Sequence, residues 1–303
     1  MKHRWKESVL KPKVSIGICA RNAQDILPLA VDSVFNQSYP HDLMEIIFVD
    51  DGSEDRTLEV MRDCSLKIDI ASRIFAGKWR GLAKARNTVV ESAAGKYIVW
   101  LDSDETIERD FVEKQVDIME RNCRAGILTA MLEIPCGTNS ILTLELIPSV
   151  IEHGRQDWKS QAKLPGTGCA TYRTIAARQV GGFDPRIEGI GEDIELASRI
   201  RQAGWSMLRG SAIFCERHGK LSTFSMLLRR YVKQGKDHRR LFEKNRQLFS
   251  IYRMNPIASF AAGMYYGWVG FLITRRRIAL VLPAHFVIKM TAWFYGFTRV
   301  QKP

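Results

Sequence analysis

The stretch Ile46-Ile47-Phe48-Val49-Asp50-Asp51-Gly52-Ser53 decides the fold class of this chain. It is an apolar run of strand length that ends in two carboxylates and a turn. The same pattern returns at residues 97–104, with the sequence YIVWLDSD. Two buried strands that each end in acids predict an open α/β sheet, whose ligand crevice lies at the carboxyl ends of its strands. Paired acids at that edge suit a nucleotide and a divalent cation, because unpaired carboxylates in an apolar core are costly.

Apolar runs and helical periodicity alternate over roughly the first 120 residues. Strands are expected there at about 14–20, 44–49, 68–74 and 96–101, and helices at about 25–36, 57–64, 81–94 and 105–121. This alternation predicts a parallel, doubly wound sheet. Further strands are expected at about 127–134, 141–147, 169–172, 205–209 and 212–215, and helices at about 175–180 and 193–203. The whole predicts a mixed α/β sheet.

The composition is that of a globular protein with an uneven charge. The chain has 303 residues, of which 46% are hydrophobic and 26% charged. Residues 216–303 carry 17 Lys and Arg against three acids, so the remainder is almost neutral despite a total charge of +12. A basic segment beside apolar runs favours anionic lipid as a partner, and nucleic acid is not expected. Six scattered cysteines without a CxxC pair, and a polar N-terminus unlike a signal peptide, indicate a cytoplasmic catalytic domain.

The C-terminal part of the chain has the features of a membrane-associated tail. Residues 222–253 are basic and amphipathic, and residues 256–274 carry no charged side chain and are long enough to cross a bilayer as a helix. A second apolar run, 278–297, is interrupted by Pro283, His285 and Lys289. We therefore predict a catalytic domain over residues 1–220 and basic amphipathic and apolar helices over residues 221–303.

Two membrane arrangements fit this tail, and a third interpretation buries its aromatic residues in a soluble helical tail. A spanning hairpin would place Arg275–Arg277 on the far side of the membrane, against the positive-inside tendency. Lys289 would also be costly at the centre of a bilayer. We therefore favour helices that lie in or dip into the cytosolic leaflet.

Five short motifs then occur in the order and rough spacing of a known family. They lie at 14–22, 49–53, 81–87, 102–104 and 191–193. Over about residues 12–215 the chain resembles family 2 glycosyltransferases with a GT-A fold, and in particular membrane-associated enzymes of lipid-linked glycan or exopolysaccharide synthesis. The resemblance implies inverting transfer of a sugar from a UDP- or GDP-linked donor to a hydroxyl group. The expected acceptor is lipid-linked or another glycan.

Asp102, Ser103 and Asp104 follow a buried strand and form a DxD motif. Two carboxylates on such a loop suit a hard cation that also touches phosphate oxygens. Mg²⁺ or Mn²⁺ is therefore the expected cofactor, which would neutralise the departing nucleotide diphosphate. The resemblance places the direct ligand on Asp104, with Asp102 beside it. A capped turn is the alternative, since Ser103 or Asp104 can begin the helix expected from residue 105.

The resemblance assigns donor binding to residues after the first two strands. Asp51 would accept a hydrogen bond from the nucleobase, since a carboxylate suits the N3–H of uracil or the N1–H of guanine. Asp50 would share that role or orient its loop, and an Asp-Gly turn is the alternative for both. Ala20, Arg21 and Asn22 would line the nucleotide pocket.

Arg86 and Gly168 are also expected at the donor. Arg86 lies on a predicted helix that faces the crevice, where it would contact phosphate or the acids of the DxD motif, or form a structural salt bridge. Gly168 occupies the place where the family presents backbone near the donor sugar, and a small residue permits close approach.

The acceptor side is assigned to Glu192, Asp193, Arg230 and Tyr231. In the resembling enzymes the base is the Asp of a Glu-Asp pair, here Asp193, with Glu192 orienting the acceptor. Capping of the following helix is the alternative. Arg230 and Tyr231 would contact the acceptor or the diphosphate, or lie on a solvated helix face. Processive relatives carry a Gln-x-x-Arg-Trp motif there, from which Leu227 and Tyr231 depart, so processivity is not expected.

Two other functions are compatible with parts of this pattern. A nucleotidyltransferase of similar fold would have a Gly-rich loop with Lys or Arg after the first strand, where this chain has the sequence ARNA at 20–23. A non-catalytic membrane scaffold would show no metal-dependent hydrolysis of a nucleotide sugar. The sequence favours the glycosyltransferase over both.

Overall fold

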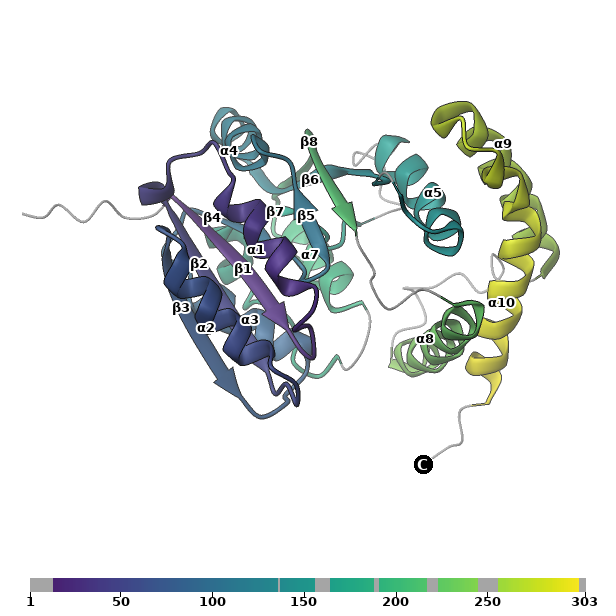
Figure 1. Cartoon of the computed structure of the whole chain (residues 1–303), viewed down its shortest axis with the longest axis horizontal. Helices are drawn as coiled ribbons and strands as arrows, with labels where there is room; N and C mark the ends of the chain where they lie inside the picture. The colour runs from purple at the N-terminus through teal and green to yellow at the C-terminus, as the bar shows by residue number, and fades with distance from the viewer. Residues whose placement is uncertain are drawn as a thin grey trace, which may run out of the picture.

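The computed structural model describes residues 13–135, 137–155, 164–187, 191–216, 223–244 and 256–299. An eight-stranded sheet forms the centre of the molecule, with the strand order β3-β2-β1-β4-β7-β6-β8-β5 (Figure 1). The strands are β1 Val14–Ala20, β2 Met44–Asp51, β3 Ala71–Gly77, β4 Tyr97–Trp100, β5 Glu105–Ile107, β6 Ala125–Glu133, β7 Thr171–Arg173 and β8 Ser206–Glu216. β1 to β4 run parallel, whereas β7 is antiparallel to both β4 and β6. The predicted mixed α/β sheet is therefore confirmed.

β1 and β2 are buried along their whole length, which explains why both are continuous apolar runs. Successive side chains of β2 enter opposite layers: Ile46 and Phe48 join one hydrophobic core, and Ile47 and Val49 join the other. Helices cover both faces of the sheet, so the predicted doubly wound architecture is also correct. They are α1 Leu27–Phe35, α2 Thr57–Lys67 and α4 Phe111–Arg121 over the first core, and α3 Leu82–Ser92, α6 Thr174–Gln179 and α7 Glu192–Gln202 over the second.

Three expected elements differ from the structure. Residues 141–147 were expected to form a strand but belong to helix α5, Ser140–Arg155. This helix is buried on two sides, because Leu142 and Leu146 join the sheet core while Ile147 packs against the C-terminal helices, and apolar residues on two helix faces imitate a strand pattern. The helix expected from residue 105 begins at Phe111, after β5. The two closing strands expected at 205–215 form the single strand β8.

The C-terminal helices stand beside the sheet (Figure 1). They are α8 Phe224–Lys244, α9 Pro256–Thr274, the short 3₁₀ helix η4 Arg277–Val281 and α10 Leu282–Thr298. α10 packs against both α8 and α9, and α5 packs against α9. Among the described residues, Ile257–Thr274 and Arg277–Thr298 are helical stretches long and apolar enough to cross a membrane. Residue 222 and residues 245–253 of the expected basic segment lie outside the described part of the chain.

Candidate active site

A cavity of about 910 Å³ lies at the carboxyl ends of β1 and β4. The loop that follows β1, the turn at residues 102–104 and helix α8 form most of its lining, together with Cys19 of β1, Leu29 of α1 and Leu82 of α3. Its charged lining residues are Arg21, Asp25, Asp102, Asp104, Arg229, Arg230 and Lys233. The cavity therefore lies at the edge of the sheet that the sequence indicated, and it combines carboxylates with cationic side chains.

Asp102, Ser103 and Asp104 all line the cavity. The chain leaves β4 and turns there, and the Glu105 amide donates to the Asp102 carbonyl at 3.0 Å. A helix cap at this turn is excluded, because β5 follows the turn and α4 begins only at Phe111. Within the ranges described, no three His, Cys, Asp or Glu side chains gather closely enough to hold a metal ion. Two carboxylates beside a large cavity fit a hard cation that takes its remaining ligands from substrate oxygens.

Arg86 of α3 connects this turn to α7. Its Nη2 lies 3.1 Å from Asp102 Oδ1 and its Nη1 lies 2.5 Å from Glu192 Oε1. Arg86 and Glu192 are both buried. Burial alone would lower the pKa of Arg86, but the charges of Asp102 and Glu192 raise it, so the guanidinium stays protonated. The sequence predicted a contact of Arg86 with the acids of the DxD motif as one of several alternatives. It did not predict the contact with Glu192.

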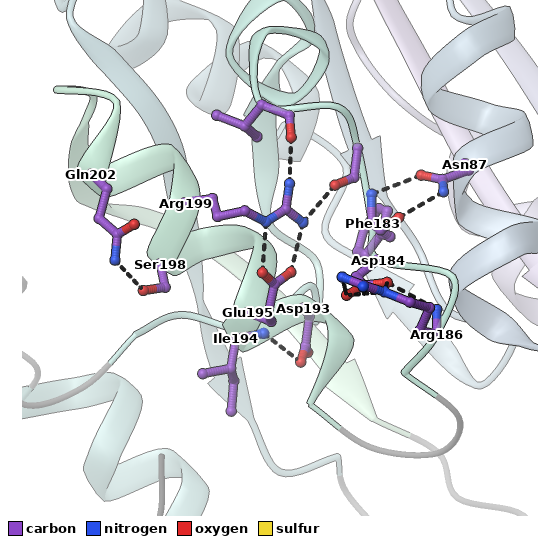
Figure 2. Close-up of polar contacts among 12 residues, drawn as sticks. Asn87, Phe183, Asp184, Arg186, Asp193, Ile194, Glu195, Ser198, Arg199 and Gln202 are labelled. Carbon is purple, nitrogen blue, oxygen red and sulfur yellow. Dashed lines mark hydrogen bonds and ion pairs between the residues drawn. The ribbon is translucent and has the colours of Figure 1, made fainter. Parts of the chain in front are cut away.

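Glu192 and Asp193 lie at the start of α7, outside the cavity lining. Burial raises the pKa of Glu192, and the Arg86 guanidinium opposes that rise. Asp193 Oδ2 accepts a hydrogen bond from the Thr167 amide at 3.2 Å. Its Oδ1 accepts one from the Ile194 amide at 2.8 Å, which Figure 2 shows. A Cβ atom on Gly166 would lie 2.8 Å from Asp193 Oδ2, so a glycine there permits this close approach.

Glu105 is a buried acid that the sequence analysis did not single out. Its Oε2 accepts hydrogen bonds from the Asp102 amide at 2.9 Å, the Cys169 amide at 3.4 Å and the Cys169 Sγ at 3.2 Å. Burial and the nearby charges of Asp102 and Glu216 raise its pKa well above the ordinary value. Glu105 thus joins the 102–104 turn to the turn before β7. Its position directly after the DxD motif could have indicated this role, but Glu105 was expected to begin a helix.

Gly168 lies beside this acid. A Cβ atom on Gly168 would lie 3.2 Å from Glu105 Oε1, so the absence of a side chain lets the two segments approach each other. The same segment contacts Asp193 through Thr167. The turn at 166–169 therefore lies between the DxD motif and the start of α7.

Asp50 and Asp51 are buried at the end of β2 and do not line the cavity. The Asp51 carboxylate accepts hydrogen bonds from the amides of Arg80 at 2.8 Å and Gly81 at 3.0 Å, which fixes the loop before α3. Asp50 Oδ1 accepts a hydrogen bond from the Ser53 amide at 3.3 Å, as in the turn that the Asp-Gly sequence allowed. Each carboxylate has about four lone-pair positions, so these contacts leave acceptor capacity.

Arg21 and Asn22 line the cavity, whereas Ala20 is buried in the sheet core. Arg21 donates through Nε to the Gly52 carbonyl at 3.3 Å, and Asn22 Oδ1 accepts a hydrogen bond from the Glu54 amide at 2.8 Å. These contacts join the loop after β1 to the loop after β2. Both residues therefore shape the cavity wall as well as lining it.

Helix α8 brings residues from beyond position 220 to the same cavity. Arg230 lines it as expected, together with Arg229, Lys233 and Met226. Tyr231 points elsewhere, because its hydroxyl donates a hydrogen bond to Glu145 of α5. The contribution of Lys233 was missed, although its spacing of four residues from Arg229 places both on one helix face.

A second set of contacts holds the segment at 180–184 between α3 and α7 (Figure 2). Arg199 of α7 donates to the carbonyls of Val180 and Gly182, the latter at 2.7 Å, and pairs with Glu195. Asn87 of α3 bonds both the amide of Phe183 at 2.7 Å and its carbonyl at 2.8 Å. Asn87 directly follows Arg86, so these bonds help to fix the position of Arg86 relative to α7.

The mixed sheet, with acids and a cavity at the carboxyl ends of its strands, has the architecture of a GT-A fold. Residues 15–181 match the family described as "Glycosyl transferase family 2", and the chain belongs to this family. It is 29% identical over 214 residues to "Probable glycosyltransferase YdaM" of Bacillus subtilis (strain 168), which covers 67% of this chain and 50% of that protein. It is 38% identical over 114 residues to "Putative teichuronic acid biosynthesis glycosyltransferase TuaG" of the same strain, covering 37% of this chain and 44% of that protein.

Solved structures share the fold. The mannosyltransferase PcManGT from Pyrobaculum calidifontis, in complex with GDP-Man and Mn²⁺, superposes with a TM-score of 0.66 at 17% identity, over 95% of this chain and 87% of that one. S. aureus TarS 1–349 in complex with UDP superposes with a TM-score of 0.50 at 14% identity, over 92% of this chain and 90% of that one. At such identities the likeness shows the fold alone. The chain spans about half the length, or less, of the curated relatives named above.

Proposed function

We propose that this chain is a metal-dependent, inverting glycosyltransferase that moves a sugar from a nucleotide-diphosphate sugar to a hydroxyl group of a lipid-linked acceptor. One observation carries the proposal: Asp102 and Asp104 share a cavity with Arg229, Arg230 and Lys233 at the carboxyl edge of the sheet. A nucleotide diphosphate needs both a cation held by carboxylates and direct cationic partners. Two structural neighbours that hold GDP-Man with Mn²⁺ or UDP support a UDP- or GDP-linked donor.

The donor would bind along the edge formed by β1, β2 and β4. Asp104, with Asp102 beside it, would hold Mg²⁺ or Mn²⁺, and the bound ion would neutralise charge on the leaving diphosphate. Arg230 and its neighbours on α8 would bind the phosphate oxygens that the ion does not contact. Asp51 would accept a hydrogen bond from the base, using the acceptor capacity that its two amide contacts leave.

The acceptor would be activated at the start of α7. Asp193 would take the proton of the acceptor hydroxyl on a carboxylate oxygen while the hydroxyl oxygen bonds to the anomeric carbon and the bond to the diphosphate breaks. Attack opposite the leaving group inverts the configuration. The Thr167 amide and the buried Arg86–Glu192 pair would hold this region in place. The turn at 166–169 would keep the base at a fixed distance from the DxD motif.

The C-terminal helices would attach the enzyme to the cytoplasmic side of a membrane. α9, η4 and α10 expose large apolar side chains, namely Ile257, Phe260, Met264, Tyr265, Trp268, Leu272, Ile273, Leu280, Val281, Ile288, Phe294 and Tyr295. Arg275–Arg277 lie between the two helices and suit anionic headgroups. His285 and Lys289 turn inward to Glu145 rather than toward lipid. Helices that lie in the cytosolic leaflet would account for the exposed apolar side chains, the arginines and the inward-facing His285 and Lys289. A lipid-linked acceptor would then reach the cavity along the membrane.

The experiment that tests this function incubates the purified chain with a panel of UDP- and GDP-sugars, with Mn²⁺, Mg²⁺ or EDTA. Release of UDP or GDP that requires the metal, and that increases with polyprenyl-phosphate acceptors, is expected. A scaffold would release neither nucleotide. A nucleotidyltransferase would also release neither, and would convert the nucleotide sugar to a nucleoside triphosphate and a sugar 1-phosphate only when pyrophosphate is added. Flotation with anionic vesicles, and its loss with neutral vesicles at high salt, would support attachment to the leaflet surface. Resistance to carbonate extraction would favour a spanning hairpin.

A further inference from the structure

Helix α8 has two faces with different partners. Arg229 and Lys233, one helical turn apart, line the cavity, and Arg230 lies beside them. Tyr231 is two positions from Arg229 and therefore points to nearly the opposite side of the helix. Its hydroxyl donates a hydrogen bond to Glu145 of α5. The same helix thus contacts the cavity on one side and the helical part of the molecule on the other.

The partner of Tyr231 belongs to a buried polar cluster. Glu145 Oε1 lies 2.5 Å from His285 Nε2 and 3.5 Å from Lys289 Nζ, both on α10. Although burial opposes it, the His285 hydrogen bond and the Lys289 charge hold the pKa of Glu145 down, at about 2. Three polar side chains from α8 and α10 therefore meet at the Glu145 carboxylate of α5. Breaking a buried arrangement of this kind is costly, so it fixes the three helices relative to one another.

A close crossing of α8 and α10 adds a second constraint. A Cβ atom on Gly235 would lie 2.0 Å from the Trp293 carbonyl oxygen, and one on Gly296 would lie 2.0 Å from the Val232 carbonyl oxygen. These backbones approach more closely than any larger residue permits. Trp293 Nε1 also lies 2.8 Å from His238 Nδ1 across the same interface. α8 has little freedom to move away from α10.

We infer that helices outside the sheet domain complete the donor site: α10 and α5, through Glu145, Tyr231 and the Gly235 crossing, hold α8 so that its cationic side chains reach the cavity. Glu145, Tyr231 and Gly235 are positioning residues that touch no substrate themselves. The donor site is therefore incomplete without the C-terminal helices, although every acid of the site precedes them in the chain. This inference rests on the proposed donor, and its test separates the two.

Two tyrosines offer a matched comparison, because each donates a hydrogen bond to a glutamate of α5. Tyr231 bonds Glu145 from α8, and Tyr266 bonds Glu152 from α9, at 2.6 Å in the second case. Titration calorimetry of UDP and GDP with Mn²⁺ on the full-length chain in detergent should show binding about fivefold or more weaker for Tyr231→Phe, the ordinary size of such a coupling. Tyr266→Phe should bind within about twofold of wild type, because α9 does not line the cavity.

Two glycines extend the comparison to backbone packing. Gly235→Ala pushes α8 from α10, whereas Gly263→Ala creates a similar clash, 2.5 Å from Pro283 Cα, between α9 and the start of α10. Weaker nucleotide binding in Gly235→Ala alone, at unchanged far-UV circular dichroism, supports the inference. Wild-type affinity in both Tyr231→Phe and Gly235→Ala overturns it while the proposed function stands. A wild-type chain that binds neither nucleotide overturns both.

Discussion

The acids and the cationic residues of the cavity are held in different ways. Asp102 and Asp104 follow a short strand in the middle of the sheet, where the backbone ladder and buried neighbours fix them. Arg229, Arg230 and Lys233 sit on a helix whose position depends on contacts with α5 and α10. The difference indicates that changes to the acids remove metal-dependent donor binding and the chemical step together, whereas changes around α8 weaken donor affinity and leave the chemical step intact.

The largest effect should come from the DxD motif. Asp104→Ala removes a carboxylate from the cavity wall and leaves the diphosphate charge poorly compensated, so transfer should fall by about 10³-fold or more. Folding should survive, because this side chain lies outside the core. Steady-state assays with thermal unfolding measure both. Asp117→Ala, which removes the surface pair with Arg121, is the control. Near-normal turnover of Asp104→Ala in EDTA would refute the metal assignment.

The next effect concerns the base. Asp193→Asn keeps the size of the side chain and removes its basicity, so kcat should fall by about 10²-fold or more. Donor affinity should change little, because Asp193 does not line the donor cavity. Calorimetry and initial rates separate the two quantities, and Asp184→Asn, which alters a surface pair with Arg186, serves as control. A collapse of donor affinity with kcat retained would show that Asp193 has another role.

Arg230→Gln probes the other side of the comparison. Losing one charge-assisted hydrogen bond to phosphate should raise the donor KM about tenfold and leave kcat nearly unchanged. Lys236→Gln is matched to it, since Lys236 is exposed on the same helix and does not line the cavity. If kcat falls and KM does not, α8 contributes to the chemical step and the division between the two regions is wrong.

The smallest effect is expected for an ion pair at the amino ends of β1 and β4, opposite the cavity, and it concerns stability. Glu120 of α4 contacts Lys96 at 2.9 Å, Tyr97 at 3.0 Å and Lys13 at 3.2 Å. Hydrogen bonds from Lys96 and Tyr97 lower its pKa from 4.5 to about 2, against the opposing effect of burial. A folded-state pKa below the unfolded value stabilises the fold above about pH 4.5, and this contribution disappears as the pH falls toward 2.

Glu120→Gln should therefore destabilise the chain at pH 7 by less than about 1 kcal/mol, since the pair is partly exposed and screened by solvent. The difference from wild type should shrink as the pH falls from 5 toward 3. Urea unfolding at several pH values measures it, with Glu59→Gln as an exposed control. A difference that grows on acidification would contradict the assignment.

The same comparison explains what the sequence could predict. β1, β2 and β4 are apolar because both faces are covered, and acids end β2 and follow β4, so local pattern was sufficient for the sheet and for Asp102 and Asp104. α5 was mistaken for a strand, because its two buried faces are created by partners distant in sequence. Glu105 and Lys233 were missed for the same reason: their roles depend on contacts with Cys169 and on the position of α8.

The central claim is that this cavity binds a nucleotide diphosphate through a metal ion held by its carboxylates. A thermal-shift titration of the full-length chain with GDP, UDP, guanosine and uridine, in Mn²⁺ or in EDTA, tests it most directly, because a ligand stabilises the state that it binds. The account predicts that at least one of the two diphosphates raises the melting temperature in Mn²⁺, and that EDTA or Asp104→Ala removes the shift. The nucleosides should have little effect. An equal shift in EDTA, or no shift with either diphosphate, would contradict the claim.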